Sequence, residues 1–77
     1  MSIATDSQIK KAFRTAYDFM TEHNEALLTV DAYKELAEAL KEKFAETQND
    51  PLTCRLLSAV YDYIGAESEK VLKNHDG

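Results

Sequence analysis

The fold is decided around QNDPLTCRLL (residues 48–57), which contains the only proline of the chain and, three residues later, its only cysteine. Proline has no backbone N–H, and the first residues of a helix have no intrahelical acceptor for theirs, so Pro51 suits the first position of a helix. Asp50 is a favoured N-cap, and Pro51 disfavours the helical conformation at this preceding residue. The stretch therefore predicts a boundary between two helices rather than a catalytic loop.

The third helix is expected over residues 51–73, because apolar residues follow the boundary densely and Lys70 and Lys73 suit a C-terminal turn. Gly65 costs roughly 1 kcal/mol relative to alanine inside a helix, so the helix either tolerates it or bends there. The apolar positions of this helix are Leu56, Leu57, Val60, Tyr61, Tyr63 and Ile64.

The first helix is expected over residues 6–23. Thr5 and Gln8 have the spacing of a capping box, and Asn24 would tolerate a left-handed conformation at the C-terminal end. Its apolar residues recur at spacings of three and four, which is typical of one helix face. These residues are Ile9, Phe13, Ala16, Tyr17 and Met20.

The second helix is expected over residues 30–47, with Thr29 or Asp31 as its N-cap. One apolar stripe runs along it, through Tyr33, Leu36, Ala37, Leu40 and Phe44. Three amphipathic helices with short connections predict an all-α three-helix bundle, in one domain that covers residues 1–77. The ends, residues 1–5 and 74–77, are expected to be flexible.

Composition excludes several classes of protein. Of the 77 residues 44% are hydrophobic, which is too many for a disordered chain, and two Gly and one Pro are too few for a β-sandwich. One Cys and two His can form neither an internal disulfide nor a four-ligand structural zinc site. No apolar run approaches the length of a membrane span and the N-terminus lacks an apolar signal region, so we expect a cytoplasmic protein without a cofactor or a membrane partner.

The negative charge is concentrated in the middle of the chain. The formal net charge is −5, and residues 21–50 contain eight acids against three lysines. An acidic chain repels phosphate backbones, so a nucleic-acid partner is not expected.

Two residues could carry chemistry, and both have a simpler explanation. Cys54 falls in the first turn of the third predicted helix, but no histidine flanks it and free cysteines are usually buried. His23 stands among Glu22 and Glu25, which fan around a helix end instead of sharing a face, so a favourable helix terminus explains it better than a metal site. We therefore predict no catalytic, cofactor-binding or metal residue.

Three groups of surface residues are candidates for interaction. Four glutamates share one side of the second helix: Glu35, Glu38, Glu42 and Glu46. Tyr61 and Tyr63 lie about 200° apart on a helix, so they cannot both face one core stripe, and tyrosine is enriched at interfaces. A weak basic patch consists of Lys10, Lys11 and Arg14.

The stretches AYDFMTEHN (residues 16–24) and NDPLTCRLLSAVYDYI (residues 49–64) resemble short, uncharacterised helical proteins of bacterial prophage regions. The resemblance covers about two-thirds of the chain, includes no catalytic motif and transfers no role to any residue. It implies an accessory protein encoded by a phage or mobile element.

Together these features favour a non-enzymatic helical protein that binds another protein. The partner is unknown, and a second copy of the chain is one alternative, because a wide apolar face on the third helix can exceed what two helices cover. A nucleic-acid-associated regulator that uses the basic patch is another alternative. A third is an inhibitor whose acidic second helix imitates the charge of DNA.

Overall fold

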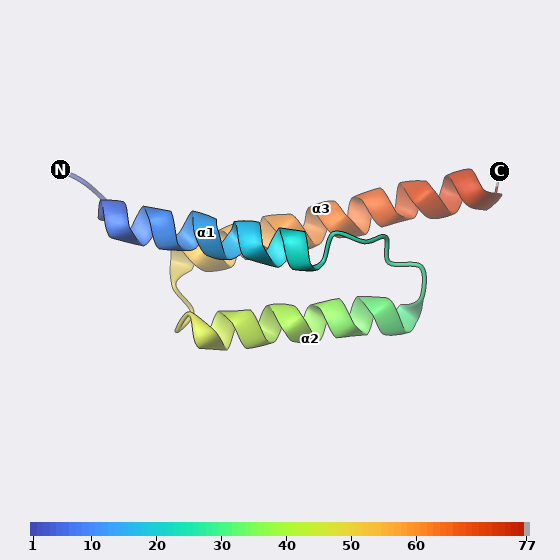
Figure 1. Cartoon of the computed structure of the whole chain (residues 1–77), viewed down its shortest axis with the longest axis horizontal. Coiled ribbons are helices and arrows are strands. Elements are labelled where there is room, and N and C mark those ends of the chain that lie inside the picture. The colour runs from blue at the N-terminus through green and yellow to red at the C-terminus, as the bar shows by residue number, and fades with distance from the viewer. Residues whose placement is uncertain (77) are drawn as a thin grey trace.

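The computed structural model describes the backbone of residues 1–76 and the side chains of residues 1–74. Over this range the chain forms three helices, α1 (Asp6–Glu22), α2 (Val30–Glu46) and α3 (Pro51–Asp76), and no strand. The predicted all-α three-helix bundle is confirmed. α1 and α3 run in the same direction, and α2 lies to one side of them and runs in the opposite direction, so the two ends of the chain lie at opposite ends of the bundle (Figure 1).

The predicted helix boundaries agree closely with the observed ones. α1 and α2 each end one residue before the predicted position, and α3 continues three residues beyond residue 73. Two parts of the predicted flexible tail lie outside the described part of the structure: Gly77 and the side chain of His75.

Side-chain caps start the first two helices as the sequence predicts. The Thr5 hydroxyl accepts from the backbone N–H of Gln8 at 3.1 Å, and the Gln8 side-chain oxygen accepts from the backbone N–H of Thr5 at 2.8 Å, which completes the capping box. At α2, the Thr29 hydroxyl accepts from the backbone N–H of Ala32 at 3.1 Å. Thr29, and not Asp31, is therefore the N-cap of α2.

α2 ends in a Schellman motif that the sequence did not reveal. The backbone N–H of Asn49 donates to the carbonyl of Phe44 at 2.8 Å, and that of Gln48 donates to the carbonyl of Ala45 at 3.1 Å. Gln48 and Asn49 take positive φ angles of 56° and 55°. Glycine usually occupies the first such position, because a Cβ atom disfavours the left-handed conformation.

The left-handed conformation predicted at Asn24 is wrong. α1 ends at His23 with a φ of −117°, and the backbone N–H of His23 continues the helical pattern by donating to the carbonyl of Phe19 at 3.1 Å. The chain then turns without a left-handed residue, with the backbone N–H of Glu25 donating to the carbonyl of His23 at 2.8 Å, whereas the tight reversal between α2 and α3 uses left-handed residues at Gln48 and Asn49.

Gln48→Gly should raise the free energy of unfolding by about 0.5–1 kcal/mol, because glycine adopts the left-handed conformation without a Cβ penalty. Chemical denaturation would measure the shift. The matched control is Ala45→Gly, one turn earlier and still helical, which should destabilise by about 1 kcal/mol. An equal loss of stability in Gln48→Gly and Ala45→Gly would contradict the inference that the backbone is strained at Gln48.

α3 is the central element against which both other helices pack. No Cα atom of α1 lies within 8 Å of a Cα atom of α2 along the described chain, whereas α3 approaches both helices. Leu57 and Ile64 of α3 are buried and join one apolar core with residues from α1, α2 and their connection. The buried members of this core are Phe19, Leu27, Leu36, Leu57 and Ile64.

α1 presents a different side to the core than its apolar spacing suggests. The buried residues of α1 are Ala12, Ala16 and Phe19. The large side chains of Phe13 and Tyr17, which belong to the apolar face expected from the sequence, are exposed. At 100° per residue the exposed stripe lies roughly 110° around the helix from the buried one. α1 therefore has a broad apolar arc, of which α3 covers only the side with the small residues.

A buried hydroxyl attaches the α1–α2 connection to α3. Ser68 is 1% exposed, and its Oγ accepts from the backbone N–H of Leu27 and donates to the carbonyl of Ile64, both at 2.7 Å. Leu27 is itself part of the core. This hydrogen bond links residues 41 positions apart and satisfies a backbone donor that is shielded from water.

Ser68→Ala should lower the free energy of unfolding by about 1–3 kcal/mol, because the buried N–H of Leu27 would lose its acceptor. The measurement is urea denaturation followed by circular dichroism. Ser58→Ala, on the same helix and half-buried, is the control and should change stability little. Equal denaturation midpoints for Ser68→Ala and the unsubstituted chain would contradict the assigned role.

α3 passes through Gly65 as one helix, although the sequence left a bend open. The Tyr33 hydroxyl lies 3.5 Å from the Gly65 carbonyl, so a tyrosine of α2 packs over this position. None of the helices in the described range is long and apolar enough to cross a membrane.

Candidate interaction face

An exposed apolar surface forms where α1 and α3 lie side by side. One groove is lined by Phe13, Tyr17 and Met20 of α1 and by Val60 of α3. A second hollow is lined by Met20 together with Tyr63 and Val71 of α3. Met20 thus joins the two into one surface. We define the apolar face as Phe13, Tyr17, Met20, Val60, Tyr63 and Val71.

The aromatic side chains of the apolar face are largely open to solvent. Phe13 is 55% exposed, Tyr17 is 64% exposed and Tyr63 is 57% exposed. Single exposed apolar residues are common, but neighbouring ones on two helices mark a contact surface. Ile9 lies one turn before Phe13 and is also exposed, so the apolar strip continues along α1.

The two ends of the apolar face carry opposite charges. Lys10 and Arg14 line it beside Phe13 and Tyr17, and the Arg14 guanidinium lies 6.0 Å from the centre of the Tyr17 ring. Glu25 and Glu67 line the other end, beside Val71. The face is therefore apolar in the middle, basic at one end and acidic at the other.

The structure separates the two tyrosines of α3, as their angular spacing predicts. Tyr61 is half-buried and packs against the core cluster, whereas Tyr63 points out of the core and is exposed. Of this pair, only Tyr63 belongs to the apolar face. Residues two positions apart lie about 200° apart around a helix, which accounts for this division.

The weak basic patch is divided between two surfaces. The Lys10 Nζ lies 3.1 Å from an Asp6 carboxylate oxygen, and the Arg14 Nε lies 3.3 Å from an Asp18 carboxylate oxygen. Both ion pairs are exposed, and each joins two residues one helical turn apart. Lys11 instead lines a polar cleft on another side of α1. The predicted triad of Lys10, Lys11 and Arg14 therefore does not form one continuous cationic surface.

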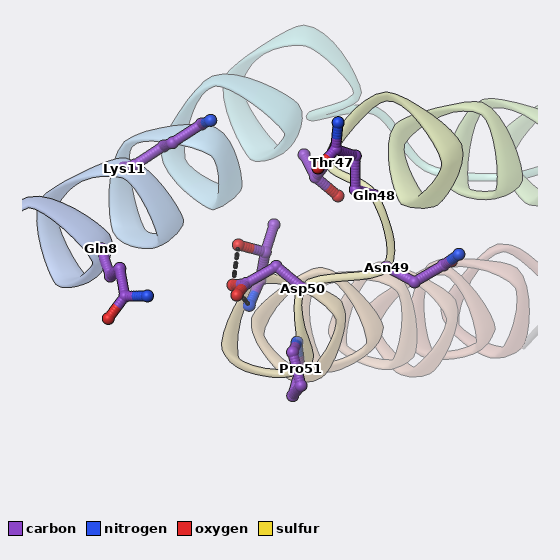
Figure 2. A pocket seen from close by; sticks show the side chains of 8 residues that line it. Gln8, Lys11, Thr47, Gln48, Asn49, Asp50 and Pro51 are labelled. Atoms are coloured by element: carbon purple, nitrogen blue, oxygen red, sulfur yellow. Dashed lines mark hydrogen bonds between the residues drawn. The ribbon is translucent and has the colours of Figure 1, made fainter. Parts of the chain in front are cut away.

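The polar cleft lies between α1 and the loop that joins α2 to α3, with a volume of about 370 Å³. Gln8 and Lys11 form one wall, and residues 47–51 form the other (Figure 2). Asp50 occupies the N-terminus of α3, where its carboxylate accepts from the backbone N–H of Thr53 at 3.0 Å and from the Thr53 hydroxyl at 2.7 Å. The cleft is thus shaped by the helix cap predicted from the sequence.

The two hydrogen bonds from Thr53 hold the pKa of the Asp50 carboxyl below its usual value, with a smaller contribution from the charge of Lys11. A carboxyl whose pKa is lowered by folding stabilises the native state above the pKa it has in the unfolded chain. That contribution disappears as the pH falls through the lower, native pKa.

Asp50→Ala should therefore lower the denaturation midpoint at about pH 7, and its difference from the unsubstituted chain should shrink as the pH falls through the lowered pKa of the native carboxyl. Chemical denaturation at several pH values provides the measurement. Asp62→Ala, an exposed position on the same helix, serves as the control. A difference that stays constant across this pH range would contradict the role of the ionised cap.

The four glutamates of the predicted acidic surface are all exposed along α2. Lys43 donates to the carboxylate of Glu46 at 3.1 Å, and this hydrogen bond raises the pKa of the lysine. Glu35, Glu38 and Glu42 complete the surface. It lies on a different element from the apolar face, so the candidate surfaces of α2 and α3 are two separate sites.

Cys54 and His23 take structural positions. Cys54 is a half-buried free thiol in the first turn of α3, and its backbone N–H donates to the carbonyl of Asp50 at 2.9 Å. His23 packs its ring against Phe19, with ring centres 4.5 Å apart. Within the described residues, no three His, Cys, Asp or Glu side chains are grouped so that they could hold a metal ion.

Comparison with known proteins adds no relative from which a role could be transferred. The chain matches no family model, no curated protein and no solved structure.

The sequence predicts part of the apolar face as one apolar side of α1, but it does not reveal that Phe13 and Tyr17 on this side stay exposed. Phe13, Tyr17 and Met20 were recognised as one stripe, and their spacing correctly places them on one side of α1. A signal was present in the adjacent small residues, because Ala12 and Ala16 form a second, narrower stripe at the spacing that close helix packing uses. The contribution of Val71 could not be found without the parallel arrangement of α1 and α3.

Proposed function

We propose that this protein is a small, non-enzymatic accessory protein that works by binding another protein chain through the apolar face. The observation that carries the proposal is the exposure of Phe13, Tyr17 and Tyr63 on one continuous surface. A core of buried residues already exists on the other side of α1 and α3, so these rings are not needed to complete the fold. Aromatic side chains ringed by charges are typical of protein-binding surfaces.

The resemblance to helical proteins of prophage regions supports an accessory role. Proteins of this size act most readily through a surface, because a chain of 77 residues has little material with which to enclose an active-site cleft. A nucleic-acid-associated regulator has less support, because Lys11 lines a different surface from Lys10 and Arg14, so the three bases do not form one cationic patch.

Site-specific photo-crosslinking in host cells tests the proposal. A photo-reactive phenylalanine analogue in place of Tyr17 should form covalent adducts with a protein partner, because this aromatic side chain of the apolar face is 64% exposed. The same analogue in place of Glu38, on the exposed side of α2, is the control. An excess of the unsubstituted chain should reduce the adducts at position 17.

The result is read from the mass and composition of the adducts. Adducts that form at position 17 and contain a different protein support a heterologous partner, and adducts of twice the mass of the chain indicate self-association. Equal adducts at positions 17 and 38, or none at position 17, would refute binding through the apolar face.

A further inference from the structure

The size of the apolar face fits an interface between two copies of the chain. Aromatic side chains bury about 150–250 Å² each, so three half-exposed rings and their apolar neighbours offer on the order of 500 Å². The largest apolar patch on a typical monomer measures about 300–600 Å² and often has a function, so the apolar face has the size of a contact surface. Two such faces would together bury about 1,000 Å², which is where specific protein interfaces begin.

Charge changes sign along α1. Residues 6–14 contain three bases and one acid, whereas residues 15–25 contain three acids and no lysine or arginine. Lys10 and Arg14 are the members of the basic segment that border the apolar face, and Glu25 is the member of the acidic segment that does so.

Charge changes sign along the neighbouring part of α3 in the same direction. Residues 51–58 contain one arginine and no acid, and residues 59–69 contain three acids and no base. α1 and α3 run in the same direction, so their basic ends coincide and their acidic ends coincide (Figure 1). Their helix dipoles also add, with the positive ends at the basic end of the face. Glu67 borders the face at the acidic end, although Lys70 lies 3.0 Å from it.

We propose that the apolar face is covered by a second copy of this chain, in an antiparallel two-fold arrangement. The proposal rests on the proposed function and names the partner of the same face. A two-fold axis that passes through the middle of the face places the basic end of each copy against the acidic end of the other. Lys10 and Arg14 of one copy then approach Glu67 of its partner, while the apolar side chains pack between them.

Charge complementarity selects this occupant and this direction. A parallel dimer would place like charges together at both ends and align the helix dipoles, which is unfavourable. A foreign partner would need its own matching pattern, whereas a second copy turned by 180° supplies it. The acidic surfaces of α2 stay outside the dimer, on separate elements from the interface.

Sedimentation equilibrium over a range of protein concentrations tests the dimer. The unsubstituted chain, with a mass of 8.7 kDa, should approach twice this mass as concentration rises. Tyr17→Glu should raise the dimer dissociation constant about tenfold or more, since it introduces a charge among the apolar side chains of the interface. Glu38→Tyr on α2 is the control and should leave the dissociation constant unchanged. Phe13→Ser is a second variant at the face, and circular dichroism establishes that each variant is folded.

A charge swap tests the antiparallel direction. Arg14→Glu and Glu67→Lys should each weaken the dimer, because each places like charges at both ends of the interface. An equimolar mixture of these two variants should restore association, because every end contact in the mixed dimer then joins opposite charges. Lys41→Glu and Glu38→Lys, on α2, make the same charge changes away from the face and serve as controls. Neither should weaken the dimer, and mixing them should not change association.

Each outcome distinguishes the further inference from the proposed function. A chain that stays monomeric at millimolar concentration, or a dimer that Tyr17→Glu and Phe13→Ser leave intact, overturns self-association through this face. If position 17 nevertheless forms adducts with another protein in cells, the proposed function stands without the dimer. A dimer in which the mixed charge variants fail to recover overturns the antiparallel direction.

Discussion

Ala12 and Ala16 allow α1 to pack closely on α3, because the distance between two helix axes depends on the side chains at their contact. These alanines are buried, and Phe19 continues their stripe into the core shared with α2. Packing through the small residues rotates the larger apolar residues of α1 away from the core. The exposed position of Phe13 and Tyr17 is thus a direct consequence of how the bundle is held together.

The same contact brings together residues that are distant in sequence. Because α1 and α3 run in one direction, Met20 lies near Val60 and also near Tyr63, and the apolar strips of two helices become one surface. The charges at its ends are aligned for the same reason. A bundle in which α1 packed against α2 instead would separate these strips, so the candidate interface depends on the topology as much as on the residues.

The polar contacts show how far local sequence reasoning extends. The caps at Thr5, Thr29 and Asp50 were predictable, because each involves residues only three positions apart. The hydrogen bond between Ser68 and Leu27 was not, because it joins distant positions and a lone serine in a helix has no local signature. The left-handed conformations at Gln48 and Asn49 were also missed, since glycine, the usual signal, is absent there.

The sequence by itself determined the number of helices, their limits and the helix boundary at Asp50–Pro51, because periodicity, capping and the missing N–H of proline act within a few residues. It also determined the charge pattern of each helix. Only the tertiary structure decided which part of the broad apolar arc of α1 is buried, because an arc wider than its partner can cover permits several rotations of the helix. That choice of rotation left Phe13 and Tyr17 exposed, while Met20 of the same stripe packs partly against the core.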